Sequence, residues 1–421
     1  MALVSDLDLA QFDYTDPEMR GERFHDAMRE LRGTGWLAQT PLGYLTLDRE
    51  AGEFFLRTRS AIFPGMKIAE IFGVQDGALF EQMKRNILHV NGPDHSRLRS
   101  LVNPALSPRA VERYRPAMRE FLEELLARAI ADSAGGGGDD GVCRCDFVEA
   151  FAKPYPSLAI ATVMGAPLQD APRLHHWSNW IQRQFDAISM SSERELIEQA
   201  VQEFYEYAEE LVRVRRATPG DDLISKLIAA EEEGERLSDV ECINLVFNVL
   251  VGGVDTSQSQ LAHAIRLLAE HPEQWERLAA EPELAEQAVE EALRYEPITP
   301  FTARITTEEV TFRDVTFPPE TVVMVCAFTG NRDLDVEGGA ASYDAADGFD
   351  ITADRGKARP LTFGAGVHYC LGANLARLEL QEGLAFLSEH LHDLQLDGEP
   401  VFEGVSGIYG LAELPIRFSV A

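Results

Sequence analysis

The segment that most constrains this fold runs from Ser238 to Glu270 and is predicted to form one long helix. Ser238 and Glu241 have the spacing of a capping box, in which each side chain bonds the backbone N–H of the other residue at a helix start. No proline interrupts the pattern from there to Glu270. At 1.5 Å per residue this predicts a helix of roughly 48 Å. A helix of that length crosses the molecule, so the rest of the chain must pack around it.

The middle of this helix, "NVLVGGVDTSQS", is unusual for a buried segment. Gly252 and Gly253 each cost about 1 kcal/mol relative to alanine in a helix interior, and Asp255 and Thr256 follow in apolar surroundings. One explanation is a helix crossing that needs glycine, with the threonine hydroxyl bonding back to a carbonyl and bending the helix. The other is a functional face of bare backbone beside an acid and a hydroxyl. Helical spacing groups on one face Asn248, Val251, Gly252, Asp255, Thr256 and Ser259.

Composition describes an ordinary globular protein with an unusual charge. Of the 421 residues, 45% are apolar and 26% are charged, as in folded globular proteins. The 38 basic and 70 acidic residues give a net charge of -32, which disfavours nucleic acid and anionic membranes as partners. The same acidic excess can serve solubility alone.

The remaining chain predicts a mainly helical fold with small β-sheets, organised as a single domain over residues 1–421. Helical periodicity with charged outer faces recurs at residues 110–132, 193–215, 238–270, 273–281, 283–295 and 372–391. Short β-branched runs occur near residue 43, between residues 309 and 328, and in the C-terminal "LPIRFSV". The glycine-rich "SAGGGGDDG" at residues 133–141 is interpreted as a flexible surface loop between helices.

No targeting or anchoring segment is apparent. The N-terminal "MALVSDLDLAQFDYTDPEM" lacks the basic and apolar regions of a secretory signal, and the most apolar run, "INLVFNVLVGGV", is too short to span a membrane. Five cysteines at irregular spacing argue against a disulfide framework, and Cys143 with Cys145 lacks the further ligands of a zinc site. We therefore expect a soluble cytoplasmic protein.

Two further groups of residues carry paired charges. Glu291 and Arg294 in "EEALRYEP" lie at i and i+3 on one helix face, which permits an ion pair. His95 and Arg99 lie one turn apart and are spaced to hold an anion together. Residues 84–119 around them contain eight basic and two acidic residues, a local net charge of +6. This reversal suggests a cofactor anion or an acidic partner, and a solvated basic face is the alternative.

The segment "FGAGVHYCLGANLARLE" places Cys370 among glycines, ahead of a predicted helix. Gly364 and Gly366 permit a tight left-handed loop after the predicted strand "PLTF", and Gly372 removes a side chain where something flat could approach the helix start. Backbone N–H groups and the helix dipole there favour a thiolate over a thiol. That thiolate could be a nucleophile or a metal ligand, but no oriented base and no second cysteine accompany it.

These motifs carry a resemblance to a known family. "FGAGVHYCLGANLARLE" resembles the haem-binding signature of the cytochrome P450 family, "GGVDT" resembles its oxygen-activation motif, and Glu291 with Arg294 matches its E-x-x-R pair. Their order and spacing agree with the family, and the similarity extends from about residue 80 to the C-terminus. The resemblance implies the cytochrome P450 fold of the soluble bacterial branch, with a haem between the long central helix and the cysteine loop. The matching signature positions are Phe363, Gly364, Gly366, His368, Cys370, Gly372, Leu375, Ala376, Arg377 and Glu379.

The resemblance assigns a role to each motif. Cys370 would be the axial thiolate ligand of a haem b. Asp255 and Thr256 would relay protons to the co-substrate O2, with Gly252 and Gly253 leaving room for it and for a distortion of the helix. The residues implied in binding the haem, the first four of them through its propionates, are His95, Arg99, Arg304, His368, Phe363, Gly364, Gly366 and Gly372.

The implied activity is that of a monooxygenase, which inserts one oxygen atom from O2 into a hydrophobic small molecule by hydroxylation or epoxidation. A peroxide-driven or isomerising haem-thiolate enzyme is the first alternative, because it does not require the Asp255–Thr256 relay. A non-catalytic haem or ligand carrier is the second.

One segment departs from the family pattern. After "NRD" the chain has Leu334 where proline is common, and "EGGAAS" lengthens the loop before "FD". Glu291 and Arg294 would be structural, held with an arginine farther along the chain. Arg355, five residues after Asp350, is the candidate for that third member.

The chain has no flavin or iron–sulfur pattern, so electrons must come from another protein. We expect NAD(P)H to supply them through a ferredoxin reductase and an acidic ferredoxin. The expected docking surface is basic, although the same cluster could serve only the propionates. Its candidate residues are Arg97, Arg109, Arg113 and Lys357.

By position, the substrate pocket should draw on the loop at residues 66–88 and on seven residues elsewhere. These are mostly apolar, which predicts a hydrophobic small molecule, with Asn248 and Thr302 as polar contacts. For each of the seven, a place in the ordinary core is the alternative. They are Asn248, Val251, Ile298, Pro300, Thr302, Ile408 and Tyr409.

Overall fold

The computed structural model describes residues 2–135, 141–232, 237–333, 347–355 and 359–420. Within these ranges the fold is mainly helical with small sheets, as the sequence predicts. Leu334, the "EGGAAS" segment and Lys357 lie outside the described residues, as does the middle of "SAGGGGDDG".

The bounds of the helices and strands in the described residues are as follows. The helices are α1 Gly21–Arg32, α2 Arg49–Arg57, α3 Met66–Ile71, α4 Gly77–Arg85, α5 Gly92–Val102, α6 Pro108–Val111, α7 Arg115–Gly135, α8 Pro154–Met164, α9 Ala171–Gln182, α10 Ala187–Ser192, α11 Arg194–Ala217, α12 Leu223–Glu232, α13 Asp239–Gly253, α14 Asp255–Glu270, α15 Pro272–Ala280, α16 Ala285–Tyr295, α17 Ala327–Gly330 and α19 Ala373–His390. The strands are β1 Ala2–Leu3, β2 Leu37–Thr40, β3 Gly43–Thr46, β4 Ala61–Ile62, β5 Val142–Asp146, β6 Phe301–Thr306, β7 Val310–Phe312, β8 Val315–Phe317, β9 Val322–Cys326, β10 His392–Leu396, β11 Val401–Phe402, β12 Leu411–Glu413 and β13 Pro415–Ser419.

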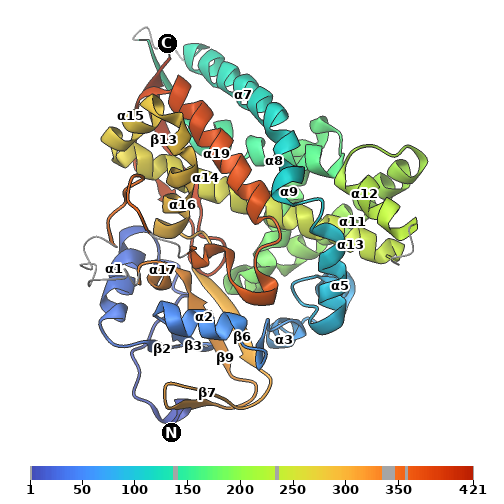
Figure 1. Ribbon diagram of the computed structural model, residues 1–421, viewed down its shortest axis with the longest axis vertical. Coiled ribbons are helices and arrows are strands. Elements are labelled where there is room, and N and C mark those ends of the chain that lie inside the picture. Colours follow the sequence, from blue (N-terminus) through green and yellow to red (C-terminus); the bar gives the residue numbers. More distant parts are fainter. Residues whose placement is uncertain (1, 136–140, 233–236, 334–346, 356–358, 421) are drawn as a thin grey trace.

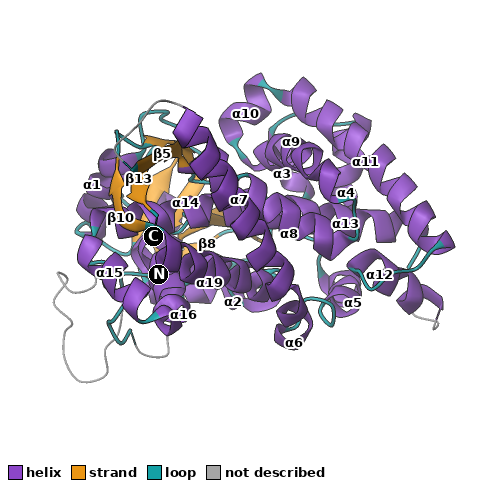
Figure 2. Ribbon diagram, turned by 90° about the horizontal axis from the view of Figure 1, so that it is seen from above, coloured by secondary structure: helices purple, strands orange, loops and turns teal. Residues whose placement is uncertain are grey.

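The strands form four small sheets that lie beside the helical layers (Figures 1 and 2). The largest has the order β2-β3-β9-β6-β4, in which β3 and β9 are parallel and the other pairs are antiparallel. Its interior strand β9 reads "VVMVC" and is almost wholly buried, as expected for a β-branched run covered on both faces. The other sheets are β1-β8-β7, β10-β13-β5 and β11-β12.

Strand β5 was not predicted from the sequence. It contains Cys143 and Cys145 and pairs with β13 along its whole length. The segment "SAGGGGDDG" therefore joins a helix to a strand, so the expectation of a loop between two helices is wrong. β5 is too short and too mixed in composition for its pattern to identify it, because its pairing partner lies far away at the C-terminus.

The long central helix is present but interrupted. Ser238 and Glu241 form both bonds of the predicted capping box at the start of α13. The helix then breaks at Val254, whose φ of -92° and ψ of -72° separate α13 from α14. Thr256 Oγ1 donates to the Gly252 carbonyl at 2.6 Å, so the predicted back-bonding threonine lies at the break. The prediction of an uninterrupted helix is wrong at this one residue.

α13 and α14 lie in the interior of the helical part, where α14 packs against α8, α9, α16 and α19 (Figure 1). Among the described residues, Asp239–Glu270 taken as one stretch is the only helix long and apolar enough to cross a membrane. Of its most apolar window, 61% is buried inside the protein, which is the environment of a core helix.

Candidate functional site

The loop that carries Cys370 begins with a helical turn. "PLTF" was expected to be a strand, but Leu361–Phe363 forms a single 3₁₀ turn. Its backbone bonds locally: Leu361 N donates to Asn331 Oδ1 at 2.6 Å, and Gly364 N donates to the Leu361 carbonyl at 2.7 Å. These two N–H groups are therefore engaged in bonds other than those of a β-ladder.

Two glycines shape the rest of the loop as predicted. Gly364 has φ +67° and Gly366 has φ +71°, a left-handed conformation that side chains disfavour. A Cβ on Gly366 would lie 2.4 Å from the Leu56 carbonyl oxygen, so the loop passes α2 at a distance that only glycine permits. Cys370 N donates to the Phe363 carbonyl at 2.9 Å, which closes the loop just before α19.

Cys370 is a free cysteine whose surroundings disfavour a bare thiolate. Burial raises the pKa of its thiol, against the opposing effects of the Gly372 and Ala373 N–H groups and the guanidinium groups of Arg99 and Arg377. The N–H groups at the helix start lower the pKa of Cys370, as predicted, but desolvation raises it by more. The helix start therefore acts in the predicted direction, and a cation on the sulfur, as a metal ligand has, would favour the thiolate further.

The nearest histidine does not act as a base toward this thiol. His368 Nε2 lies 3.1 Å from Asn91 Oδ1, and burial with neighbouring cations lowers the pKa of His368 to about 3. This disfavours the nucleophile hypothesis that the sequence left open.

The four residues expected at the haem propionates form one cluster, in which His95 and Arg304 are buried and Arg99 and His368 are half-buried. The rings of His95 and His368 lie 4.2 Å apart between centroids. Arg99 and Arg304 both add to the electrostatic lowering of the His368 pKa, which places them nearby. Burial, and then the Arg99 charge, lowers the pKa of His95 as well.

The two arginines of this cluster have no carboxylate ion-pair partner among the residues that the structure describes. Arg304 is 2% exposed and donates Nη1 to the Ala303 carbonyl at 2.8 Å. Desolvation without a counter-charge lowers its pKa to about 10. Arg99 is half-buried and donates Nη2 to the Tyr369 carbonyl. Because a buried guanidinium group is normally paired, a bound group with two carboxylates, as a haem has, fits Arg304 together with Arg99.

The glycines of the site divide into two kinds. A Cβ on Gly252 or on Gly372 would meet nothing within 4 Å, so both face open space. A Cβ on Gly253 would instead lie 2.3 Å from Ile160 Cδ1 on α8. Gly252 and Gly372 thus leave a space that a flat cofactor and O2 can occupy, whereas Gly253 permits a helix crossing. Of the two glycines expected to leave room for O2 and for a helix distortion, only Gly252 faces open space, and the helix breaks directly after Gly253.

Asp255 and Thr256 start α14 but point to different partners. Thr256 Oγ1 is held by the Gly252 carbonyl, beside the open space. Asp255 Oδ2 accepts from Ser178 Oγ on α9 at 2.7 Å. Oδ1 has no hydrogen-bond partner in the described part of the chain, and the residue is only 5% exposed.

Burial changes the acidity of Asp255. Desolvation raises its pKa to about 6, opposed by Ser178, Asn179 and the positive charge of Arg183. A carboxyl group with such a pKa can both bind and release a proton near neutral pH. Sequence analysis missed Ser178, because nothing in the local α9 sequence shows that this serine faces Asp255.

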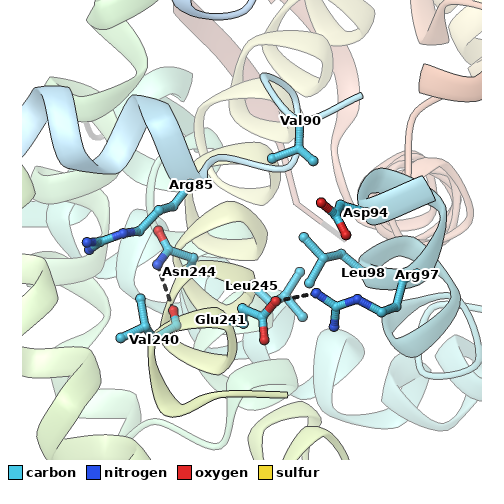
Figure 3. Close-up of a pocket in the computed structure, with 9 residues that line it drawn as sticks. All are labelled: Arg85, Val90, Asp94, Arg97, Leu98, Val240, Glu241, Asn244 and Leu245. Atoms are coloured by element: carbon cyan, nitrogen blue, oxygen red, sulfur yellow. Dashed lines mark hydrogen bonds and ion pairs between the residues drawn. The ribbon is translucent and has the colours of Figure 1, made fainter. Parts of the chain in front are cut away.

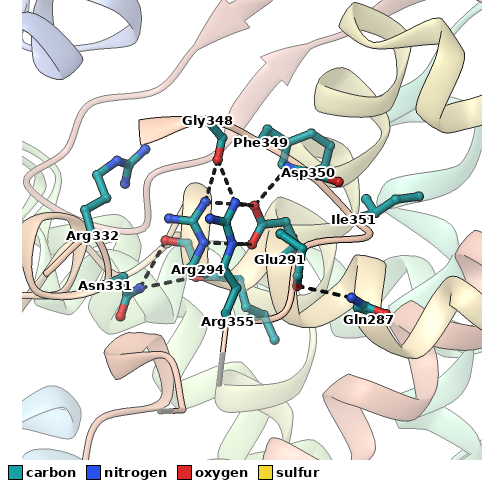
Figure 4. A network of polar contacts seen from close by, with 12 residues as sticks. Gln287, Glu291, Arg294, Asn331, Arg332, Gly348, Phe349, Asp350, Ile351 and Arg355 are labelled. Atoms are coloured by element: carbon teal, nitrogen blue, oxygen red, sulfur yellow. Dashed lines mark hydrogen bonds and ion pairs between the residues drawn. The ribbon is translucent and has the colours of Figure 1, made fainter. Parts of the chain in front are cut away.

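Glu291 lies at the centre of a polar network that joins α16 to the segment before the cysteine loop (Figure 4). Arg294 Nε donates to Oε2 at 2.7 Å and Arg355 Nη2 donates to Oε1 at 2.7 Å. Asp350 N donates to Oε1 at 3.0 Å. Both guanidinium groups also donate to the Gly348 carbonyl. The structure thus brings Arg355 onto the Glu291–Arg294 pair, in the place where the sequence predicts a third member.

The candidate substrate residues are spread over α13, the start of β6 and the C-terminal loop. Val251 and Ile298 are buried, at 5% exposure each. Asn248 is half-buried and donates Nδ2 to the Asn244 carbonyl at 2.6 Å. Pro300 is buried, whereas Thr302 and Ile408 are half-buried. Contact of these residues with a substrate stays a prediction.

Tyr409 does not line a pocket. It is fully buried, its ring packs 5.5 Å from Phe24 and 6.0 Å from Phe402 between centroids, and its hydroxyl accepts from Gly21 N at 3.1 Å. The predicted substrate contact is therefore wrong, because the chain after Ile408 turns into the core around α1.

A surface hollow of about 200 Å³ opens between α4, α5 and α13 (Figure 3). An ion pair between Arg97 and Glu241 crosses it. Arg97, a residue of the predicted ferredoxin surface, lines this hollow. The lining residues are Arg85, Val90, Asp94, Arg97, Leu98, Val240, Glu241, Asn244 and Leu245.

A second hollow, of about 480 Å³, lies directly beside the cysteine loop. Arg49, Arg57 and Arg359 contribute positive charge to it and Glu53 contributes negative charge. Gly364, Gly366 and Tyr369 of the loop form part of its wall. This hollow therefore gives a polar approach to the outer side of the loop.

Comparison with known proteins agrees with this geometry. The family model for cytochrome P450 matches residues 73–397. Luteothin monooxygenase of Streptomyces thioluteus is 34% identical over 418 residues, which are 98% of this chain and 97% of that protein. Mycinamicin IV hydroxylase/epoxidase of Micromonospora griseorubida is 35% identical over 318 residues, 75% of each chain.

Solved structures share the fold. The crystal structure of CalO2 has a TM-score of 0.86 and 29% identity, over 98% of this chain and all of that one. The family model matches most of the chain, and two relatives are more than 30% identical over three quarters of it or more. This protein therefore belongs to the cytochrome P450 family.

Proposed function

We propose that this protein is a single-domain haem b monooxygenase that inserts one oxygen atom from O2 into a hydrophobic small molecule, by hydroxylation or epoxidation. The observation that carries the proposal is a pair of cations without a carboxylate ion-pair partner among the described residues, the half-buried Arg99 and the buried Arg304, beside a free cysteine in a glycine-shaped loop. A haem held by Cys370 and these cations would supply the binding and activation of O2.

Residues of the chain would then transfer protons and hold the proton-carrying groups in position. Thr256 presents a hydroxyl at the open space beside Gly252. Asp255, with a pKa raised to about 6, can give up a proton and take another near neutral pH. Ser178 fixes the orientation of the carboxyl group by donating to Oδ2.

The direct test is spectroscopic. The purified, reduced protein should bind carbon monoxide with the red-shifted Soret band of a thiolate-ligated haem. Cys370→Ser should abolish that shift, because serine does not supply the thiolate, whereas Cys145→Ser should keep it. A protein that binds no haem, or whose carbon monoxide complex lacks the shift, would overturn the proposal.

Replacing Thr256 separates the monooxygenase from a peroxide-driven or isomerising enzyme. Thr256→Ala removes the hydroxyl that bonds the Gly252 carbonyl, so we expect at least tenfold less product per electron and a matching release of hydrogen peroxide. Conversion of substrate by peroxide at an unchanged rate in this variant, with no O2-dependent product in either protein, would support the alternative.

The substrate class follows from the relatives and from the apolar candidates. Luteothin monooxygenase and mycinamicin IV hydroxylase/epoxidase support hydroxylation or epoxidation of a largely apolar small molecule, with Val251 and Ile298 as contacts. A library screened for the spin-state shift of the haem should identify binders, and Val251→Phe should weaken them severalfold by filling space. Unchanged affinity in that variant would remove Val251 from the pocket.

We further propose that an acidic ferredoxin, reduced from NAD(P)H by its reductase in the cytoplasm, supplies the electrons. For its docking surface we favour arginines other than Arg97 and Arg113 of the sequence prediction. Arg97 pairs with Glu241 and Arg113 pairs with Asp221. Arg109 on α6 and Arg359 in the hollow beside the cysteine loop have no ion pair among the described residues, whereas Arg49 and Arg57 of that hollow pair with Glu53.

A further inference from the structure

The hollow of about 200 Å³ between α4, α5 and α13 has an apolar floor (Figure 3). Leu98 and Leu245 form this floor, and both side chains are buried. Val240 also lines the hollow and is an apolar residue with 44% of its surface exposed. Leu88, two residues before the lining residue Val90, is exposed as well. The hollow thus offers apolar surface to a hydrophobic small molecule that arrives from solvent.

One face of α13 connects this hollow with the open space at Gly252. Glu241, Leu245, Asn248 and Gly252 follow one another at spacings of four, three and four residues, so they lie on one side of the helix. From Glu241 to Gly252 the helix rises by about 17 Å. Glu241 and Leu245 line the hollow, whereas a Cβ on Gly252 would meet nothing within 4 Å. The hollow and the open space therefore lie at two ends of the same helix face.

This helix face is accessible at both ends and closed between them. Glu241 and Asn248 are half-buried, and Gly252 is exposed. Leu245, which lies between Glu241 and Asn248, is only 2% exposed. The Leu245 side chain is therefore the barrier between the hollow and the inner space along α13.

α5 forms the opposite wall of the hollow and also reaches the candidate site. Arg97 and Leu98 line the hollow, whereas His95 and Arg99 of the same helix belong to the cluster expected at the haem propionates. Separation of α5 from α13 would therefore open a path from the hollow to the site, beside Leu245.

An ion pair crosses the hollow and ties α5 to α13 (Figure 3). Arg97 Nη2 on α5 donates to Glu241 Oε1 on α13. The other carboxylate oxygen, Oε2, accepts from Ser238 N at 2.8 Å in the capping box, so the start of α13 holds Glu241 in place. Both side chains of the pair are partly exposed, and such ion pairs contribute little to stability and are screened by salt. The tie can therefore open without unfolding the helices that it joins.

We propose that this hollow is an entrance through which a hydrophobic substrate reaches the space beside Gly252. The Arg97–Glu241 pair closes the entrance by holding α5 against α13, and Leu245 is the barrier that the substrate must pass. This inference rests on the proposed monooxygenase function, because the passage ends where the haem and O2 would be bound.

The first experiment measures entry and exit of a ligand. Binding of 4-phenylimidazole to the ferric holoprotein can be followed by stopped-flow through the shift of the Soret band. Arg97→Gln removes the tie and should raise the association and dissociation rates alike, by about two- to fivefold, with an unchanged Kd. Equal changes in both rates identify an entrance, whereas loss of a residue that contacts the bound ligand changes Kd. High salt should bring the unaltered protein toward the rates of the variant.

Arg216→Gln is the matched control. Arg216 also pairs with an acidic residue in the first turn of α13, Asp239, but it is not among the residues that line the hollow. Its replacement should leave both rates unchanged.

Leu245→Ala tests the barrier and should raise both rates, because it shortens the side chain that separates the hollow from the inner space. Haem content and circular dichroism confirm that each variant is folded, and Leu245→Val should give a smaller increase if the alanine variant does not fold. If Arg97→Gln and the Leu245 variant both match the unaltered protein, the entrance is overturned while the monooxygenase stands.

The second experiment does not depend on haem. Hydrogen exchange of the purified protein, read by mass spectrometry, should be faster in α5 for Arg97→Gln than for Arg216→Gln, because only the first variant releases α5. Equal exchange in α5 of the two variants would overturn the role of the ion pair. If the purified protein holds no haem, the proposed function fails, and this measurement still decides whether Arg97 and Glu241 close the hollow.

Discussion

Glu379 on α19 shows what burial does to a single side chain. It is 1% exposed, and neither carboxyl oxygen has a hydrogen-bond partner among the described residues, although Ser257 lies near. Desolvation raises its pKa to about 8, so the acid is neutral inside the folded protein at pH 7. In the unfolded chain the same group is ionised above about pH 4.5. Folding therefore takes up a proton in the range between these two values.

This proton uptake predicts a pH dependence of stability. Between about pH 4.5 and about pH 8 the folded state binds one proton more than the unfolded state, so the contribution of Glu379 to stability falls by about 1.4 kcal/mol per pH unit as the pH rises. Glu379→Gln cannot ionise, so relative to the unaltered protein it should gain stability from pH 5 to pH 7.5. Urea unfolding of the holoprotein at both values measures this, and an equal difference at the two pH values would contradict it.

At the scale of the element, the two adjacent glycines at the end of α13 have different surroundings. Gly253 faces Ile160 on α8, which is fully buried, and Gly252 faces open space. Both lie in a helix and share the same intrinsic propensity, so only their surroundings distinguish them. The sequence left two explanations open, a helix crossing that needs glycine and an open face. Both are present, one residue apart.

The two alanine variants of these glycines should therefore differ in sign. Gly253→Ala places a methyl group 2.3 Å from Ile160 Cδ1 and should destabilise the protein by about 1–3 kcal/mol. Gly252→Ala meets no atom within 4 Å and should stabilise the haem-free protein by about 1 kcal/mol through helix propensity. Urea denaturation measures both values. Adding Ile160→Val should restore part of the loss in Gly253→Ala, and equal effects of the two alanines would contradict the assignment.

At the scale of the whole molecule, tertiary ion pairs neutralise much of the basic segment at residues 84–119. Arg97 pairs with Glu241 on α13 and Arg113 pairs with Asp221 before α12. Arg115 and Arg119 both reach Glu382 on α19. The surface formed by this segment is therefore less basic than its local net charge of +6 suggests. Acidic residues from distant parts of the chain, whose net charge is -32, neutralise several of its arginines.

The arginines left for an acidic partner lie around the cysteine loop. We predict that Arg109→Gln combined with Arg359→Gln slows reduction by an acidic ferredoxin severalfold at low ionic strength and much less at high salt, because exposed charges steer association and are screened. Haem content should not change. Arg29→Gln with Arg213→Gln, on α1 and α11, is a charge-matched control. Equal slowing by the control pair would show an effect of net charge only.

Local geometry made much of the fold and the cysteine loop predictable. The capping box at Ser238, the left-handed Gly364 and Gly366, and the back-bonded Thr256 each depend on atoms within a few residues, and the structure contains all of them. The "PLTF" strand and the unbroken helix were wrong because pairing partners and helix breaks depend on neighbours that the local pattern does not contain.

The sequence by itself determined the motifs and their order, since helix periodicity, capping and glycine conformation are short-range properties. Only the tertiary structure decided which side chains lose water and which partners they meet. It set Ser178 against Asp255, left Arg304 without a carboxylate and placed Tyr409 in the core. Burial and charge pairing depend on residues far apart in the chain. In the site, these two effects determine the pKa values of Cys370 and Asp255.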